Sequence, residues 1–166
     1  MVLAKDYEEL QVGIAEYKVT SGPNRLVTLG LGSCVGVSLY DPIMKLGGLL
    51  HIMLPDSTQF KDVSKPAKFA DLGIPLMIND LKRRGASVLR FQCKLVGGAQ
   101  MFSGMDKKII LNIGERNYKA ARQILNDLRI RILAEELGGN HGRTMIFDTA
   151  TGEVLIRALG GVNRVI

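Results

Sequence analysis

One cysteine and one histidine are the residues whose types and spacing could support catalysis. The cysteine follows two glycines, and the histidine lies further along the chain. Cys34 ends the run Gly30-Leu31-Gly32-Ser33-Cys34, and His51 stands seventeen residues further along the chain. Glycines permit backbone conformations that lift a nucleophile from a sheet onto an accessible turn. A thiol near its free pKa is only slightly ionised at neutral pH and needs a neighbouring base, for which His51 is the candidate.

Nearby hydroxyl and backbone groups could complete such a site. A third group usually fixes the tautomer of a catalytic imidazole, and the hydroxyls of Thr28 and Ser33 are close in sequence. Ser33 could instead shape the turn, while the backbone N–H of Cys34 could stabilise the oxyanion of a tetrahedral intermediate. Gly32 and Ser33 are therefore candidates for binding the substrate or its oxyanion.

Core packing is the alternative interpretation of both reactive side chains. Free cysteine is among the most buried residue types, and a histidine between Leu50 and Ile52 is commonly a satisfied core residue. Composition and spacing alone favour this alternative. His141 is expected in a surface loop, and neither His141 nor His51 has metal-ligand spacing to the cysteines, so no metal site is expected.

The elements that would have to position Cys34 and His51 are strands. Apolar residues alternate over 15–19 and 35–39, and a mostly apolar run covers 46–54. A hairpin through Asp41-Pro42 would bring the start of the second strand, next to Cys34, to the end of the third, next to His51.

Two helices and four further strands are predicted downstream. The first helix covers 66–84 with an interruption at Pro75 and an end at Gly85, and the second follows Gly114. Its apolar stripe is Tyr118, Ala121, Leu125 and Leu128. The predicted strands are 89–95, with Leu89, Phe91, Cys93 and Leu95 on the core face, 130–134, and a hairpin with arms 145–147 and 154–159. We therefore predict one domain over residues 1–166 with an α/β layered fold, in which two main helices cover a mixed sheet.

The composition is that of an ordinary globular protein. The chain has 166 residues, of which 46% are hydrophobic and 23% charged. No apolar run approaches the roughly 20 residues that cross a bilayer, and the first residues lack the features of a signal peptide. We therefore expect a cytoplasmic protein without membrane insertion, in which Cys34 and Cys93 are thiols.

The net charge of +6 is compatible with any negatively charged partner and does not choose among them. The only dense basic cluster, Lys82-Arg83-Arg84, lies at the predicted end of a helix, where cations stabilise the helix dipole. Because no aromatic residues are interleaved with these cations, nucleic-acid binding is not expected.

Five ordered segments of the sequence resemble the CheD family, the chemoreceptor glutamine deamidases of bacterial and archaeal chemotaxis. The resemblance extends along nearly the whole chain. The segments are Leu31-Gly32-Ser33-Cys34-Val35, His51-Ile52-Met53-Leu54-Pro55, Val96-Gly97-Gly98-Ala99-Gln100-Met101-Phe102, Ile113-Gly114-Glu115-Arg116-Asn117 and Leu137-Gly138-Gly139-Asn140-His141-Gly142-Arg143.

The resemblance implies an active site made of Cys34, His51 and Thr28 that needs no cofactor or metal. It implies a fold similar to the catalytic domain of the cytotoxic necrotizing factors, and a thioester route from glutamine to glutamate on methyl-accepting chemotaxis receptors. A CheC-type phosphatase is the implied partner, and a regulatory binding module for that phosphatase and the receptors is the alternative function. A cysteine protease would use the same nucleophile and base, but the resembling family acts on side-chain amides.

The same resemblance raises three smaller questions about loops. Gly97-Gly98 and Gly138-Gly139 could surround the active site or serve as ordinary turns. Met101 and Phe102 could form an exposed apolar contact, although core packing is the favoured interpretation. Arg143 could shape its loop through hydrogen bonds or lie near the substrate.

Overall fold

The computed structural model describes residues 5–101 and 112–166. The segments with alternating apolar residues form a five-stranded sheet in the order β2-β5-β4-β6-β7, in which only β6 and β7 are parallel. The strands are β2 (Tyr17–Ser21), β4 (Val35–Asp41), β5 (Leu46–Ile52), β6 (Gln92–Gly97) and β7 (Arg131–Leu137). The predicted strands over 35–39, 46–54 and 130–134 are confirmed.

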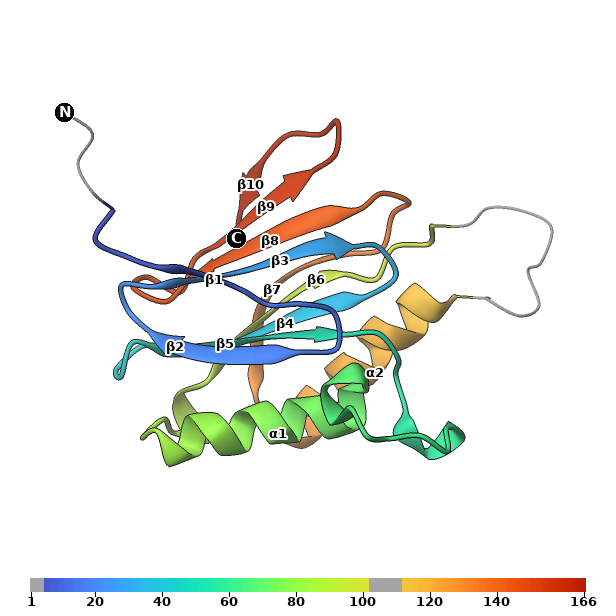
Figure 1. Ribbon diagram of the computed structural model, residues 1–166, viewed down its shortest axis with the longest axis horizontal. Coiled ribbons are helices and arrows are strands. Elements are labelled where there is room, and N and C mark those ends of the chain that lie inside the picture. Colours follow the sequence, from blue (N-terminus) through green and yellow to red (C-terminus); the bar gives the residue numbers. More distant parts are fainter. Residues whose placement is uncertain (1–4, 102–111) are drawn as a thin grey trace.

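A second five-stranded sheet packs on one face of the first (Figure 1). Its order is β1-β3-β8-β9-β10, with β1 and β3 parallel. The strands are β1 (Glu9–Gln11), β3 (Arg25–Leu31), β8 (Arg143–Asp148), β9 (Val154–Ala158) and β10 (Arg164–Val165). The prediction of one mixed sheet is therefore wrong in the number of sheets. The error arose at β3, whose apolar alternation is interrupted by Gly30 at a β-bulge.

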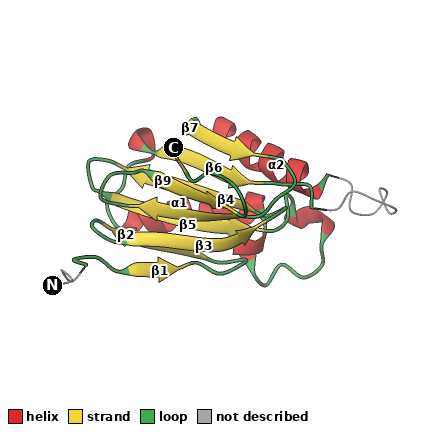
Figure 2. Cartoon of the chain, turned by 90° about the horizontal axis from the view of Figure 1, so that it is seen from above, coloured by secondary structure: helices red, strands yellow, loops and turns green. Residues whose placement is uncertain are grey.

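Two helices cover the opposite face of the first sheet, so the fold has a helical layer and two sheet layers (Figure 1). They are α1 (Ala70–Arg83) and α2 (Ile113–Asp127), and short 3₁₀ helices occupy Ser57–Gln59, Pro66–Lys68 and Val88–Arg90. Pro75 lies inside α1, and Gly85 follows the helix with φ +102°. The α/β class and the two covering helices are confirmed. Figure 2 shows the strands running side by side along the molecule, with the helices behind them.

The central strands β4 and β5 are buried along their whole length because they lie between the helices and the second sheet. Val37 and Leu50 belong to the core beneath the helices, whereas Tyr40 and Leu49 belong to the core between the sheets. Full burial of each such side chain contributes about 1.5–3 kcal/mol. A Cβ at Gly47 would lie 2.5 Å from the Phe147 ring, so glycine is what allows the sheets to approach here.

Two apolar residues predicted in the core are exposed. Leu89 is 97% exposed because residues 88–90 form a 3₁₀ turn instead of the start of β6. That turn is held by Asp41, which accepts hydrogen bonds from the Ser87 N–H at 3.0 Å and from Arg90 Nη2 at 2.7 Å. Leu128 is 43% exposed because α2 ends at Asp127. Phe91, Cys93 and Leu95 are buried as predicted.

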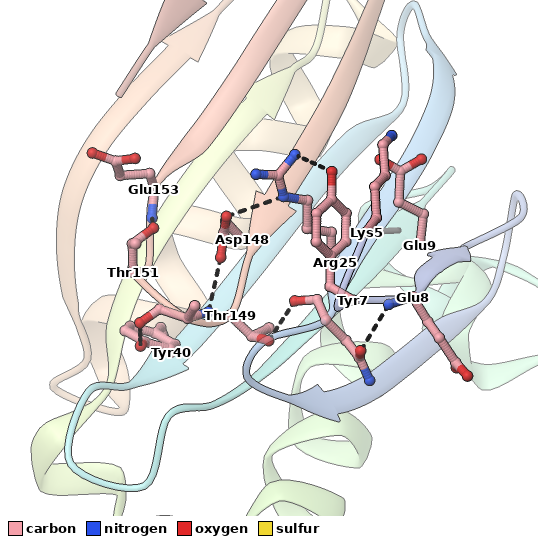
Figure 3. Close-up of polar contacts among 12 residues, drawn as sticks. Lys5, Tyr7, Glu8, Glu9, Arg25, Tyr40, Asp148, Thr149, Thr151 and Glu153 are labelled. Carbon is pink, nitrogen blue, oxygen red and sulfur yellow. Dashed lines mark hydrogen bonds and ion pairs between the residues drawn. The ribbon is translucent and has the colours of Figure 1, made fainter. Parts of the chain in front are cut away.

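A polar network joins the segment before β1 to β3 and β8, at the end of the second sheet where β3 begins (Figure 3). Arg25 Nε donates to Asp148 at 3.0 Å, and Arg25 Nη1 donates to the Tyr7 hydroxyl at 3.1 Å. Thr149, fully buried, donates its hydroxyl hydrogen to the Asn24 carbonyl at 2.6 Å. Within residues 5–101 and 112–166, no helix is both long and apolar enough to cross a membrane.

Candidate active site

Cys34 and His51 lie on neighbouring strands at the same end of the first sheet. In the β4–β5 ladder Gly36 pairs with His51 and Val35 pairs with Ile52, which confirms the hairpin predicted through Asp41-Pro42. Cys34 is two residues before Gly36, and side chains two residues apart share a face, so Cys34 and His51 both face the second sheet. Such diagonal neighbours have Cα atoms roughly 7–8 Å apart.

A buried chain of hydrogen bonds orients the His51 ring. The Thr28 hydroxyl donates its single hydrogen to the Val12 carbonyl at 2.7 Å, and its oxygen lies 2.7 Å from His51 Nδ1. Because that hydrogen is already used, the contact forms only if Nδ1 carries the proton and donates to Thr28. Nε2 is then the unprotonated nitrogen with a free lone pair. It is buried and has no hydrogen-bond partner among the described residues.

The structure thus brings Thr28 and His51 into contact and places Cys34 on the same face of the sheet, with no hydrogen bond from its thiol to the ring. Catalytic hydrogen bonds are often long in the absence of substrate and tighten when it binds. Core packing, the alternative interpretation, describes His51 in part because its ring is 0% exposed. It also describes Cys34 only in part, because Cys34 packs at the edge of the core between the sheets but stays half-buried. It does not account for Nε2, which has no partner among the described residues.

A bulge in β3 brings Thr28 to this position. Thr28 pairs with Met145 and Leu31 pairs with Arg143, so three steps along β3 correspond to two steps along β8. The extra residue is accommodated at Gly30, whose φ of +68° is readily adopted by glycine. Thr28 and Leu31 consequently both face inward, and the chain turns directly into the segment that carries Cys34.

The backbone of His51 is fixed by the segment that precedes β2. Its N–H donates to the Glu16 carbonyl and its carbonyl accepts from the Ala15 N–H, both at 3.0 Å. Opposite His51, a Cβ at Gly36 would lie 2.6 Å from the Met145 sulfur. The ring is therefore held from the backbone as well as from Nδ1.

The turn before Cys34 is fixed by backbone hydrogen bonds. The Gly32 N–H donates to Gly30 at 2.9 Å, the Gly32 carbonyl accepts from Ala99 at 2.8 Å, and the Cys34 carbonyl accepts from Gly98 at 2.8 Å. The N–H of Gly32 is therefore occupied and not free to stabilise an oxyanion. Within the described part of the chain, the N–H groups of Ser33 and Cys34 donate to no other residue. Both N–H groups therefore remain available as hydrogen-bond donors.

Arg143 shapes the two glycine pairs near Cys34. Its guanidinium is 4% exposed and donates to the carbonyls of Gly97 at 3.0 Å and Gly138 at 2.5 Å. The Gly138 N–H in turn donates to the Gly97 carbonyl at 2.9 Å. All four glycines have positive φ, from 65° to 115°. Of the two predicted roles for Arg143, loop shaping through hydrogen bonds is confirmed.

Burial favours the neutral forms of both candidate catalytic groups. It lowers the pKa of His51 from 6.5 to about 4, because an imidazolium would be deprived of water. Burial also raises the pKa of the Cys34 thiol, against a smaller lowering by its own backbone N–H. At neutral pH the resting site therefore contains a thiol and a neutral imidazole, and the proton must move when the thiol attacks.

Several other predictions can be compared with the structure. Met101 is 44% exposed, which contradicts core packing, and a Cβ on Gly32 would lie 3.0 Å from its Cγ. Phe102 lies outside the described residues. His141 is exposed, as predicted. In the part of the chain that is described, no group of three His, Cys, Asp or Glu side chains is placed to hold a metal ion.

Sequence reasoning missed Asn117 of α2 as a residue of the site. Its side chain is 0% exposed, and Nδ2 donates to the carbonyls of Ser33 and Met53, both at 2.9 Å. A signal was present, because Asn117 interrupts the buried stripe formed by Gly114, Ala121 and Leu125. A carboxamide on the apolar face of a helix needs a polar partner.

The sequence matches known proteins along its whole length. Residues 53–158 match the family described as CheD chemotactic sensory transduction. A protein of Desulforamulus reducens named "Probable chemoreceptor glutamine deamidase CheD" is 67% identical over 166 residues, which is all of both chains. Proteins of the same name from Clostridium kluyveri and Clostridium botulinum strain Hall are 52% and 51% identical over 155 residues, covering 93% of this chain and 96% of theirs.

Proposed function

Because the chain belongs to the CheD family, we propose that it is a protein-glutamine deamidase that converts glutamine side chains of chemoreceptors to glutamate, with Cys34 as nucleophile. The observation that carries the proposal is the state of His51. Thr28 fixes the proton on Nδ1 and leaves Nε2 unprotonated. Nε2 is buried, has no partner among the described residues and belongs to the face that Cys34 shares. A ring held in this way is suited to act as a base.

The first half of the proposed reaction forms a thioester. Nε2 of His51 takes the proton of the Cys34 thiol as the sulfur attacks the side-chain carbonyl carbon of glutamine. The carbonyl oxygen becomes an oxyanion, which the N–H groups of Ser33 and Cys34 can stabilise. The C–N bond then breaks, and the amide nitrogen takes the proton from the His51 imidazolium and leaves as ammonia.

The second half returns the enzyme to its starting state. Water attacks the thioester carbonyl while Nε2 of His51 accepts one of its protons. The C–S bond breaks, the proton returns to the Cys34 sulfur, and the product is glutamate. All atoms are supplied by glutamine and water, so no cofactor takes part.

The low pKa of His51 sets an energetic condition for the first step. Moving a proton from a thiol with a raised pKa to an imidazole with a pKa of about 4 is unfavourable in the resting site. Each new charge stabilises the other at short range, since opposite charges within about 4–6 Å favour ionisation. The proton transfer is therefore coupled to attack on the substrate instead of preceding it.

Three further features accompany this proposal. We infer a cytoplasmic location, because the substrate glutamines would lie on the cytoplasmic part of the receptors. We infer that the fold is related to the catalytic domain of the cytotoxic necrotizing factors, which rests on family resemblance and agrees with the α/β class. Binding of a CheC-type phosphatase likewise rests on the resemblance.

The decisive experiment incubates the protein with purified cytoplasmic fragments of chemoreceptors and measures Gln-to-Glu conversion by peptide mass spectrometry. Conversion is expected with the unaltered protein and is expected to be absent with Cys34→Ala and with His51→Ala. Tight binding without conversion would overturn the proposal and support a regulatory binding module. Cleaved receptor fragments would instead indicate a cysteine protease.

A further inference from the structure

Asn117 joins the two segments that carry the proposed nucleophile and base. Its Nδ2 has two hydrogens, and each is directed to one backbone carbonyl, that of Ser33 or that of Met53, at 2.9 Å. Ser33 immediately precedes Cys34, and Met53 follows His51 by two residues. Within residues 5–101 and 112–166, no other side chain forms hydrogen bonds to both segments.

The two hydrogen bonds of Asn117 lie beyond the end of the β4–β5 ladder, where no backbone pairing connects the two strands. The last pair of the β4–β5 ladder at this end is Val35 with Ile52. Ser33 and Met53 both lie beyond that pair, so no ladder bond between β4 and β5 fixes the separation of their backbones. The carboxamide of Asn117 takes the place of the missing ladder bonds as a cross-link between the two chain segments.

Helix α2 is fixed against the same region by a second contact. Gly114 lies one turn before Asn117, on the same buried face of the helix. A Cβ at Gly114 would lie 2.6 Å from the Gly98 carbonyl oxygen, so only glycine permits this approach. The N–H of Gly98 donates to the Cys34 carbonyl. The helix therefore supports the Cys34 segment directly through Asn117 and indirectly through Gly98.

A carboxamide fits this position because its nitrogen has the two donor hydrogens that the two carbonyls accept. Asn117 Oδ1 is buried without a partner among the described residues, so the side chain acts here through its two donor hydrogens. An aspartate of the same shape would direct an oxygen, not a donor, at two carbonyl oxygens. An alanine would leave both carbonyls without donors and the two segments without a cross-link.

From these contacts we propose that Asn117 is a positioning residue, which sets the distance and orientation between the Cys34 thiol and Nε2 of His51. It touches neither group and acts through the backbone of Ser33 and Met53. The inference rests on the proposed function in treating Cys34 and His51 as a reacting pair. It adds that the pair is assembled by helix α2.

The test measures the alkylation rate of Cys34 by iodoacetamide as a function of pH, with peptide mapping to separate Cys34 from the buried Cys93. The difference between the unaltered protein and His51→Ala defines how much the imidazole assists the thiol. Asn117→Ala is expected to shift the profile most of the way to that of His51→Ala, with a loss of about tenfold or more near neutral pH, since general-base assistance is typically worth 10²–10⁴-fold.

A matched control separates positioning from stability. Thr149 (Figure 3) is also fully buried and also donates to a backbone carbonyl. It follows the end of β8 opposite to Arg143, which contacts the glycine turns. Thr149→Val is expected to lower the unfolding midpoint while leaving the alkylation profile unchanged. If Asn117→Ala kept the unaltered profile at a similar loss of stability, the inference would be overturned.

A second variant covers the case in which Asn117→Ala does not fold. Asn117→Ser keeps a small polar side chain with one donor in place of two, and its profile is expected to lie between those of the unaltered protein and His51→Ala. An unaltered profile in this variant would also count against the inference. Where turnover can be measured, kcat is expected to fall in both variants while KM changes little, because Asn117 is 0% exposed and would not contact the substrate.

The deamidation and alkylation measurements distinguish failure of the proposed function from failure of the positioning role of Asn117. If receptor fragments are not deamidated but His51→Ala and Asn117→Ala both alter alkylation, the proposed substrate is wrong and the positioning role stands. If His51→Ala has the profile of the unaltered protein, there is no pair to position and both proposals fall. If only Asn117→Ala has that profile, the positioning role alone falls.

Discussion

The Thr28 oxygen lies 2.7 Å from His51 Nδ1 while the Thr28 hydrogen is donated to the carbonyl of Val12. A hydroxyl without its own donor function acts on the imidazole as a pure acceptor. Like the carboxylate of other nucleophile–base sites, the Thr28 hydroxyl holds the imidazole in one tautomer, but it brings no negative charge into the core. Burial, and not a charged neighbour, lowers the pKa of His51 to about 4.

Thr28→Val should therefore remove the interaction that fixes the tautomer of His51. The substitution preserves shape but leaves His51 Nδ1 and the Val12 carbonyl without partners, which costs about 1–3 kcal/mol of unfolding free energy. Deamidation should fall by about tenfold or more, because the proton is no longer held on Nδ1. Thr28→Ser retains the hydroxyl and should restore most of the activity. Equal activity in Thr28→Val and the unaltered protein would contradict the assigned tautomer.

Cys34→Ala should separate chemistry from folding. The side chain is half-buried and packs at the margin of the core between the sheets, so the expected loss of unfolding free energy is below about 1.5 kcal/mol. Turnover should be lost completely, because no other group can form the thioester. Circular dichroism melts and the receptor-fragment assay check the two halves of this prediction. Residual deamidation above background would exclude Cys34 as the nucleophile.

The buried imidazole of His51 should make the free energy of unfolding depend on pH between 6.5 and about 4. Its pKa is about 4 in the folded protein and 6.5 when unperturbed, so the unfolded chain binds the proton first as the pH falls. The contribution is fully present above pH 6.5 and is lost between pH 6.5 and about 4, amounting to about 3 kcal/mol.

Denaturant unfolding at a series of pH values measures this window. His51→Gln has no proton to bind, so its stability should lack the loss between pH 6.5 and 4 that the unaltered protein shows. Contributions of carboxylates occur in both proteins and cancel in the difference. If the two curves ran parallel through this range, His51 would not be buried in its neutral form.

The sequence was sufficient to predict the elements whose apolar pattern is regular and local. Strand β4 follows from period-two alternation, β5 from its mostly apolar run, and the hairpin from the turn at Asp41-Pro42. This hairpin alone places Cys34 and His51 at the same end of the sheet. Helix α2 likewise follows from its apolar stripe. These patterns are local, so they can be recognised without knowledge of the rest of the fold.

Features that depend on distant contacts could not be predicted. The second sheet requires β3, whose pattern is interrupted by a bulge that is stabilised by pairing with β8 more than one hundred residues later. Leu89 is exposed because residues 88–90 form a 3₁₀ turn instead of the start of β6. That turn is stabilised by a hydrogen bond from Arg90 to Asp41, which lies on another strand. The partners of Asn117 also lie far away in sequence, in the segments of Ser33 and Met53.

Asp41 provides a last prediction, in which stability should be lost while activity is kept, the opposite of what is expected for Cys34→Ala. Its carboxylate is 0% exposed and accepts hydrogen bonds from Arg90 and from the N–H groups of Ile43, Met44 and Ser87. Burial raises the pKa of Asp41, but these hydrogen bonds outweigh it and bring the pKa from 3.8 to about 2.

Asp41→Asn should cost about 2–3 kcal/mol of unfolding free energy at neutral pH, because it removes the charge that these donors surround, while the half-exposed Arg90 can regain water. The difference from the unaltered protein should be constant above pH 3.8 and shrink between pH 3.8 and 2, as Asp41 itself becomes protonated. Deamidation below the melting temperature should be unchanged, because Asp41 and Cys34 flank opposite ends of β4. A parallel loss of activity in the folded variant would mean that this end of the sheet also contributes to the site.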